Sequence, residues 1–267
     1  MSNSFTTVTA STQFSDSIEL RNHLLALLSE VKDYHEFTYT DLPTPWGLKL
    51  FEGIDEQFPL RKTLNTKERT LQVRAMPREI HDCVQPWITR AMYTAWNLDP
   101  EEKKLLRPGV GTTLNFQYGP YRGSRKEPDF FLRPDAFTLP TIAVETGWSE
   151  TKSRLLDDMN VLLVGGNGQI IMVILVNWEK IQGEYVSGEV EVYRRDVNGM
   201  PRCIQKEVVF SAPDPPRTQL ISLTRRDIFQ NALLPNRNPK TVMTLDIAEL
   251  RDEAINALSI MGLRPAV

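Results

Sequence analysis

The segment KEPDFFLRPDAFTLPTIAVETGWSETKSRLL, residues 126–156, contains two short apolar runs, each with one carboxylate at an end. Asp129 comes just before the run Phe-Phe-Leu, and Glu145 ends the run Ile-Ala-Val. Short apolar runs bounded by prolines and a glycine predict β-strands. The residues after the second run begin with a good N-cap serine and predict a helix over 149–164. The segment therefore predicts two strands and a helix, with both acids at strand ends.

The sequence on either side of this segment predicts more strands. The run QIIMVILVNW, residues 169–178, is almost wholly apolar, which is typical of a central strand covered on both faces. Residues 188–210 alternate around Asn198-Gly199 and predict a hairpin. We expect residues from about 110 to 195 to form one sheet, with the helix over 150–164 packed on it. This order of elements predicts an α/β fold, with a mixed central sheet flanked by helices.

Three regions of different character divide the chain. Residues 1–15 are rich in serine and threonine and predict a flexible tail. Residues 16–75 predict a helical N-terminal addition, because leucines follow helical spacing after a capping residue, whereas 40–53 is typical of a loop. Residues 76–267 form the main predicted domain. It opens with a helix that Pro86 should kink or break, and the segments 223–233 and 243–258 predict its final helices.

The composition limits the classes of function. The 267 residues carry a formal net charge of −3, so nucleic acid would have to be bound by a local basic patch. Cys83 and Cys203 are far apart, have no zinc-ligand spacing and fit a reducing compartment. No run approaches the roughly 18 apolar residues of a membrane span, and the first residues do not resemble a secretory signal. We therefore expect no membrane association and an intracellular location, nuclear or cytoplasmic.

Two acids at neighbouring strand ends favour a hard divalent cation. Mg²⁺ or Mn²⁺ prefers carboxylate oxygens and retains several waters, so Asp129, Glu145 and the carbonyl of Thr146 would form half of a site. Such a cation lowers the pKa of bound water and offsets charge on a phosphate. The alternative is structural: Asp129 would be a surface acid after a turn proline, and Glu145 a salt-bridge partner.

A series of motifs resembles the core of the PD-(D/E)XK nuclease superfamily, the restriction-endonuclease-like fold, and within it a group of fungal proteins. The matching residues, in order, are Met76-Pro77, His81-Asp82, Lys126, Pro128-Asp129, Val144-Glu145, Gly147, Ser149-Glu150, Leu155 and Asp158. The match covers roughly residues 76–230. It implies a metal-dependent nuclease that hydrolyses phosphodiesters, with Asp129 and Glu145 holding the metal; we expect DNA more than RNA as its substrate. The oligomeric state is left open, with a homodimer as one alternative.

One position departs from the superfamily pattern. Gly147 stands where the superfamily has a lysine that positions the attacking water. Lys152 in the following helix is the first candidate to replace that charge, and its alternative is a solvated helix residue. Lys126 is the second candidate, although strand alternation would turn it away from the face of Asp129. Gly147 also supports the alternative function, a catalytically inactive domain that binds nucleic acid or protein.

Further residues have weaker support for a role in the site. The resemblance favours Asp82 as a third acid, whereas a helical wheel places His81 at the apolar border and Asp82 nearly opposite. Basic residues flank both acids and are candidates for contacts with backbone phosphates; they are Arg122, Arg125, Lys126, Arg133 and Arg154. Ordinary surface charge explains them equally well, because acidic residues lie among them.

Overall fold

The computed structural model describes residues 6–54, 59–75, 79–148 and 152–267. Contacts divide the chain into two compact units. The first unit comprises residues 1–78 and 112–127, and the second comprises 79–111 and 128–267. The expected boundary at residue 76 lies next to this division, and the chain then returns to the first unit for sixteen residues.

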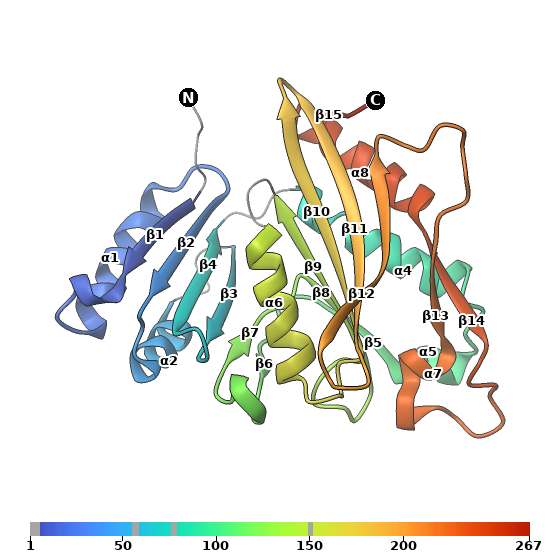
Figure 1. Cartoon of the computed structure of the whole chain (residues 1–267), viewed down its shortest axis with the longest axis horizontal. Helices are drawn as coiled ribbons and strands as arrows, with labels where there is room; N and C mark the ends of the chain where they lie inside the picture. Colours follow the sequence, from blue (N-terminus) through green and yellow to red (C-terminus); the bar gives the residue numbers. More distant parts are fainter. Residues whose placement is uncertain (1–5, 55–58, 76–78, 149–151) are drawn as a thin grey trace. The chain divides into compact units, whose positions relative to one another are not determined.

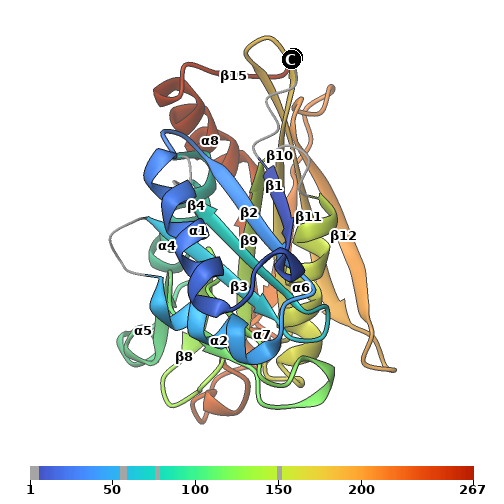
Figure 2. The same ribbon diagram turned by 90° about the vertical axis from the view of Figure 1, so that its left-hand side faces the viewer.

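The first unit is built on a six-stranded sheet with the order β1-β2-β4-β3-β7-β6. Its strands are β1 (Thr6–Ala10), β2 (His35–Thr40), β3 (Leu60–Asn65), β4 (Thr70–Ala75), β6 (Leu114–Asn115) and β7 (Arg125–Lys126). The helices α1 (Ser17–Glu30) and α2 (Thr44–Gly53) lie together on one face of β2, β3 and β4 (Figure 2), and two short 3₁₀ turns occur at Ser11–Gln13 and Gly119–Tyr121. Buried side chains of the helices and strands, among them Leu20, Leu24, Phe37, Leu71 and Val73, form its core.

This unit corrects three expectations about the N-terminal part of the chain. Residues 6–10, expected in a flexible tail, form β1 and pair in parallel with β2. Residues 16–75 are mixed α/β rather than only helical, because β2, β3 and β4 lie among them. The expected loop over 40–53 contains α2, whose first turn includes Pro45. Proline is well tolerated in that turn, because its missing N–H would have no helical partner there.

The second unit is built on a seven-stranded sheet with the order β12-β11-β10-β9-β8-β5, and β15 pairs with β11 (Figure 1). Its strands are β5 (Leu106–Gly109), β8 (Phe130–Pro134), β9 (Ile142–Trp148), β10 (Met172–Gln182), β11 (Tyr185–Arg195), β12 (Pro201–Phe210) and β15 (Arg264–Pro265), and β13 (Leu220–Thr224) pairs with β14 (Val242–Asp246) separately. Its helices are α3 (Glu79–Asp82), α4 (Val84–Thr94), α5 (Pro100–Leu105), α6 (Lys152–Gly165), α7 (Arg225–Phe229) and α8 (Ile247–Ile260), followed in the case of α7 by a 3₁₀ turn at Gln230–Ala232. The expected α/β class, with mixed sheets flanked by helices, is confirmed.

Most elements of the second unit follow the expected order. The strand β10 is parallel to β9, its residues 172–176 are buried, and α6 packs on both strands. The helix α6 lies on one face of the sheet, while α4 and α8 lie on the other (Figure 1). The expected break near Pro86 falls at Cys83, between α3 and α4, which leaves the proline in the first turn of α4.

Two expectations about the second unit are wrong. The strands β6 and β7, expected in the same sheet as the acids, belong to the first unit. The predicted helices over 223–233 and 243–258 begin later, at Arg225 and Ile247, because the end of β13 and most of β14 occupy their first residues. In the part of the chain that the structure describes, no helix has both the length and the hydrophobicity needed to cross a membrane.

Candidate metal and ligand site

Asp129 comes immediately before β8, and Glu145 is the fourth residue of the neighbouring strand β9, both in the second unit. The expected position of Glu145 at the end of its strand is wrong, because β9 continues to Trp148. The antiparallel register of β8 and β9 pairs Phe130 with Val144. Asp129 is the residue just before this paired stretch of β8, and Glu145 is the residue just after Val144 on β9. Asp129 is 4% exposed and Glu145 is 0% exposed, so both acids are buried.

Thr146 fixes the carboxylate of Asp129. Its backbone N–H donates to Asp129 Oδ2 at 2.8 Å, and its hydroxyl lies 2.9 Å from the same oxygen. The hydroxyl is also 3.2 Å from the carbonyl oxygen of His81, so its single proton is shared between two acceptors. The expected role of Thr146 was to offer its carbonyl; the structure uses its N–H and hydroxyl instead.

The helix α3 supplies a buried histidine and an exposed acid. His81 is 2% exposed, and its carbonyl accepts the bond from Thr146. Asp82 is exposed and accepts a hydrogen bond from Gln85 at 2.9 Å. His81 is therefore the inward residue of α3, as the helical wheel predicted. Asp82, which the resemblance favoured as a third acid, is exposed and does not lie in the buried cluster with Asp129. Met76, Pro77, Ser149 and Glu150, which belong to the family motif, lie outside the described residues.

The face of the sheet that carries Glu145 continues across β10 and β11. Glu145 pairs with Leu175, which in turn pairs with Glu191. Gly147 pairs with Asn177, which pairs with Glu189. Cross-strand partners share a face, so this face carries two more acids beyond Glu145. Neighbouring strands are about 4.8 Å apart, which puts the Glu191 backbone roughly 10 Å from that of Glu145.

Lys152, the candidate catalytic lysine, is the first residue of α6 and is bound by these additional acids. Its Nζ is 2.6 Å from Glu189 Oε1 and 2.9 Å from Glu191 Oε1. Lys206 on β12 completes the network, with Nζ 2.6 Å from Glu189 Oε2 and 3.1 Å from Glu191 Oε1. Lys152 is thus an ion-paired residue on the same face as Glu145, rather than a solvated helix residue. We call these four residues the charge tetrad.

The charge tetrad is ionised at neutral pH. The hydrogen bond to Glu189 raises the pKa of Lys152 well above its ordinary value, and the pKa of Lys206 is raised for the same reason. Burial alone would raise the pKa of Glu189 and Glu191. Hydrogen bonds from Lys152 and Lys206 outweigh this effect, so the pKa of both carboxyls is lowered. The tetrad therefore has two positive and two negative charges and no net charge.

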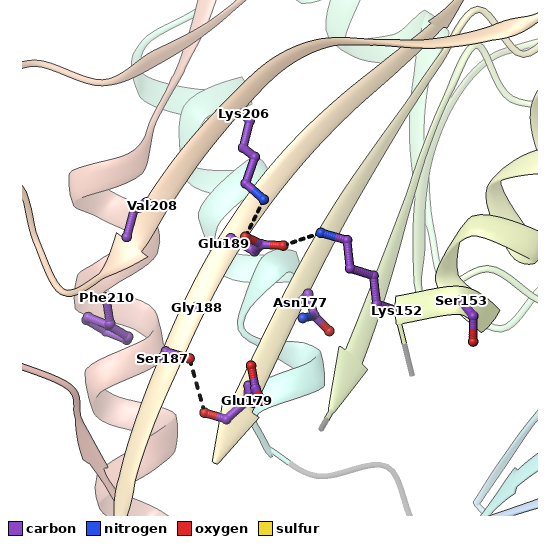
Figure 3. A pocket seen from close by; sticks show the side chains of 10 residues that line it. All are labelled: Lys152, Ser153, Asn177, Glu179, Ser187, Gly188, Glu189, Lys206, Val208 and Phe210. Atoms are coloured by element: carbon purple, nitrogen blue, oxygen red, sulfur yellow. Dashed lines mark hydrogen bonds and ion pairs between the residues drawn. The ribbon is translucent and has the colours of Figure 1, made fainter. Parts of the chain in front are cut away.

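A cavity of about 480 Å³ opens beside the tetrad (Figure 3). Residues from α6, β10, β11 and β12 line it; they are Lys152, Ser153, Asn177, Glu179, Ser187, Gly188, Glu189, Lys206, Val208 and Phe210. Sequence reasoning missed all of them except Lys152. The alternation Glu189-Val190-Glu191-Val192 was a readable signal, since alternate residues of a strand share a face.

The other basic candidates lie elsewhere. Arg122, Arg125 and Lys126 belong to the first unit. Arg125 forms an ion pair with Glu52 at 2.8 Å. Arg122 is exposed and lines the same surface cavity as Arg125. Lys126 is fully buried and donates to Thr63 Oγ1 at 3.0 Å, so it is not presented for a phosphate contact.

Two basic candidates belong to the second unit. Arg154 is partly exposed on α6. The guanidinium of Arg133 lies over the ring of Phe131, 5.5 Å from its centroid.

The donor set of the candidate metal site is small. Among the residues that the structure describes, no three His, Cys, Asp or Glu side chains form a group that could hold a metal ion. A pair of carboxylates still fits Mg²⁺, which is commonly bound by one or two carboxylates and completes its octahedron with water. No family model matches the chain, and no curated protein or solved structure is significantly similar to it.

Proposed function

We propose that the chain is a metal-dependent nuclease of the PD-(D/E)XK type that hydrolyses phosphodiesters of DNA. The observation that carries this proposal is the pair of buried carboxylates, Asp129 just before β8 and Glu145 on the neighbouring strand β9. Thr146 holds Oδ2 of Asp129 by two donors, its backbone N–H and its hydroxyl, which fixes the orientation of this carboxylate. The fixed orientation of one carboxylate supports a metal ligand, because coordination by Mg²⁺ tolerates little deviation from ideal geometry.

The chemistry divides between the cation and the residues of the chain. When bound, Mg²⁺ or Mn²⁺ supplies a water of lowered pKa and charge neutralisation at the phosphate. Asp129 and Glu145 hold it, and Thr146 keeps Asp129 in place. Lys152 is protonated and lies on the face of the sheet that carries Glu145, so it would donate a hydrogen bond to a phosphate that approaches on this side, although the tetrad as a whole has no net charge.

A charge-removing substitution tests the metal site. Glu145→Gln keeps the size of the side chain and removes its charge, so calorimetric titration should show Mn²⁺ affinity falling by at least about 100-fold, the loss of one strong charge-assisted ligand. Plasmid nicking should be lost in parallel. Glu30→Gln, which changes an exposed acid of α1, is the matched control. Equal Mn²⁺ binding by Glu145→Gln and the parent would exclude Glu145 as a ligand.

The second candidate function is a catalytically inactive domain of the same type that binds nucleic acid or protein. It is favoured by Gly147 and by the engagement of Lys152 with Glu189 and Glu191. Lys152→Ala separates the two functions. In a nuclease it should reduce nicking in Mn²⁺ by about 100-fold or more while leaving Mn²⁺ binding intact, because lysine is not a ligand of hard cations. A parent protein that cleaves neither DNA nor RNA, single- or double-stranded, would leave only the binding function.

A further inference from the structure

Two hydrogen-bond acceptors outside the charge tetrad, Asn177 and Glu179, line the same cavity. Asn177 and Glu179 are alternate residues of β10 and therefore point to the same face, and both line the cavity (Figure 3). Asn177 Oδ1 is buried, and no donor among the described residues reaches it. Glu179 is exposed. Buried acceptors are nearly always hydrogen-bonded, so Asn177 Oδ1 indicates that a water molecule or a bound ligand donates to it.

The lysines of the tetrad add donors on the opposite side. A lysine ammonium has three N–H groups, and the ion pairs of Lys152 and Lys206 use two on each. Each lysine therefore keeps one N–H for an oxyanion, as far as the described residues show. Both side chains are about half exposed, at 47% and 48%, so a ligand in solvent can reach them.

The volume of the cavity and the charges that line it limit the class of ligand that it can bind. A volume of about 480 Å³ is in the usual range for pockets that hold a small organic molecule. The tetrad is neutral and Glu179 is negative, so a bare phosphate would gain little from this cavity. A suitable ligand needs one anionic group for the lysines, N–H donors for Asn177 and Glu179, and an apolar body beside Val208 and Phe210. A nucleotide combines these three properties.

We propose that this cavity binds one unpaired nucleotide of the nucleic-acid substrate and prefers guanine. Guanine presents N1–H and the N2 amino group side by side, so one carboxylate of Glu179 can accept both; uracil presents a single N–H. The base must leave its stack to enter, as bases do in other enzymes that read a flipped nucleotide. The inference rests on the proposed function, because the nucleotide would be part of the same nucleic-acid substrate. Asn177 on β10 pairs with Gly147 on β9, two residues beyond Glu145, so the cavity lies one strand from Glu145.

Binding of free nucleotides without divalent metal tests this assignment. Calorimetry should show GMP binding about ten times more tightly than IMP, which lacks only the N2 amino group and so one charge-assisted hydrogen bond. UMP should bind no better than IMP, and ribose 5-phosphate and inorganic phosphate more weakly still. Glu179→Gln should remove the preference for GMP over IMP, while Glu30→Gln should preserve it. Thermal melting followed by circular dichroism checks that Glu179→Gln, a change of an exposed residue, is folded.

The outcomes separate this inference from the proposed function. Equal affinities for GMP, IMP and ribose 5-phosphate, or no binding of any of them, would overturn the nucleotide pocket even if the protein cleaves DNA. A preference for GMP that survives Glu179→Gln would overturn the assigned contact. Conversely, a protein that binds GMP selectively and cleaves nothing would retain the pocket and lose the nuclease.

Discussion

The hydroxyl of Thr146 should contribute more to stability than a similarly buried hydroxyl that has a neutral acceptor. Thr146 is 0% exposed, and its hydroxyl lies 2.9 Å from a carboxylate oxygen of Asp129. Thr141 is also 0% exposed, and its hydroxyl donates to the carbonyl of Ile228 at 2.8 Å. Both residues belong to the second unit. Threonine-to-valine substitution replaces each hydroxyl by a methyl group and keeps the shape of the side chain.

The expected magnitudes follow from the two acceptors. A hydrogen bond to a charged group contributes about 1.5–3 kcal/mol, and one between neutral groups about 0.5–1.5 kcal/mol. The added apolar surface is the same at both positions, so it cancels in the comparison. Thr146→Val should therefore reduce the free energy of unfolding by roughly 1–1.5 kcal/mol more than Thr141→Val does. It should also weaken Mn²⁺ binding, because Asp129 would lose one of the two donors that orient it.

Urea denaturation followed by tryptophan fluorescence measures this difference. Four of the five tryptophans, Trp87, Trp96, Trp148 and Trp178, lie in the second unit, so the signal reports chiefly on the unit that carries both substitutions. The reasoning would be refuted if Thr146→Val cost no more than Thr141→Val at equal m-values. That result would mean that the carboxylate of Asp129 does not depend on the hydroxyl.

Three further outcomes are expected. Gly188→Ala should cost about 1–3 kcal/mol in urea denaturation, because a Cβ would lie 2.3 Å from the ring of Trp178; an unchanged midpoint would contradict the packing. A thiol reagent should modify exposed Cys203 in the native protein, while Cys83, buried and with its thiol pKa raised by burial, should react only on unfolding. Glu191→Gln should lower the free energy of unfolding at pH 7 by up to about 1 kcal/mol. The pKa of Glu191 is lowered in the folded state, so the ionised carboxylate stabilises the fold at neutral pH, and the difference between variant and parent should vanish as the pH falls below 4.5.

The elements with a strong hydrophobic pattern could be predicted from the sequence. Residues 169–178 could only be a buried strand or helix, and their length and β-branched content favoured the strand that forms most of β10. Asp129 and Glu145 were expected at adjacent strand ends; Asp129 does come just before β8, but Glu145 lies in the middle of β9, which continues to Trp148. The nuclease activity itself stays a prediction.

Other features depend on contacts between distant parts of the chain. The strand β3, Leu-Arg-Lys-Thr-Leu-Asn, has a weak alternation, and its place in a sheet comes from its pairing with β4 and β7. The partners of Lys152 lie 37 and 39 residues along the chain, and only the course of β11 brings them to α6. The helix α2 was missed because two prolines and two glycines over 40–53 were taken to indicate a loop, whereas Pro43 and Pro45 lie at the start of the helix.

The return of residues 112–127 to the first unit affects the order in which the protein can fold during synthesis. The sheet of that unit lacks β6 and β7 until residue 126 has left the ribosome, because Thr63 pairs with Lys126 across 63 positions. Closing so long a loop is slow compared with local pairing. During synthesis, one edge of β3 therefore stays exposed while the segment containing α4 emerges, until β7 can pair with it. A fragment ending at residue 78 should accordingly aggregate, whereas a circular permutant that begins at residue 79 would present β6 and β7 before β3.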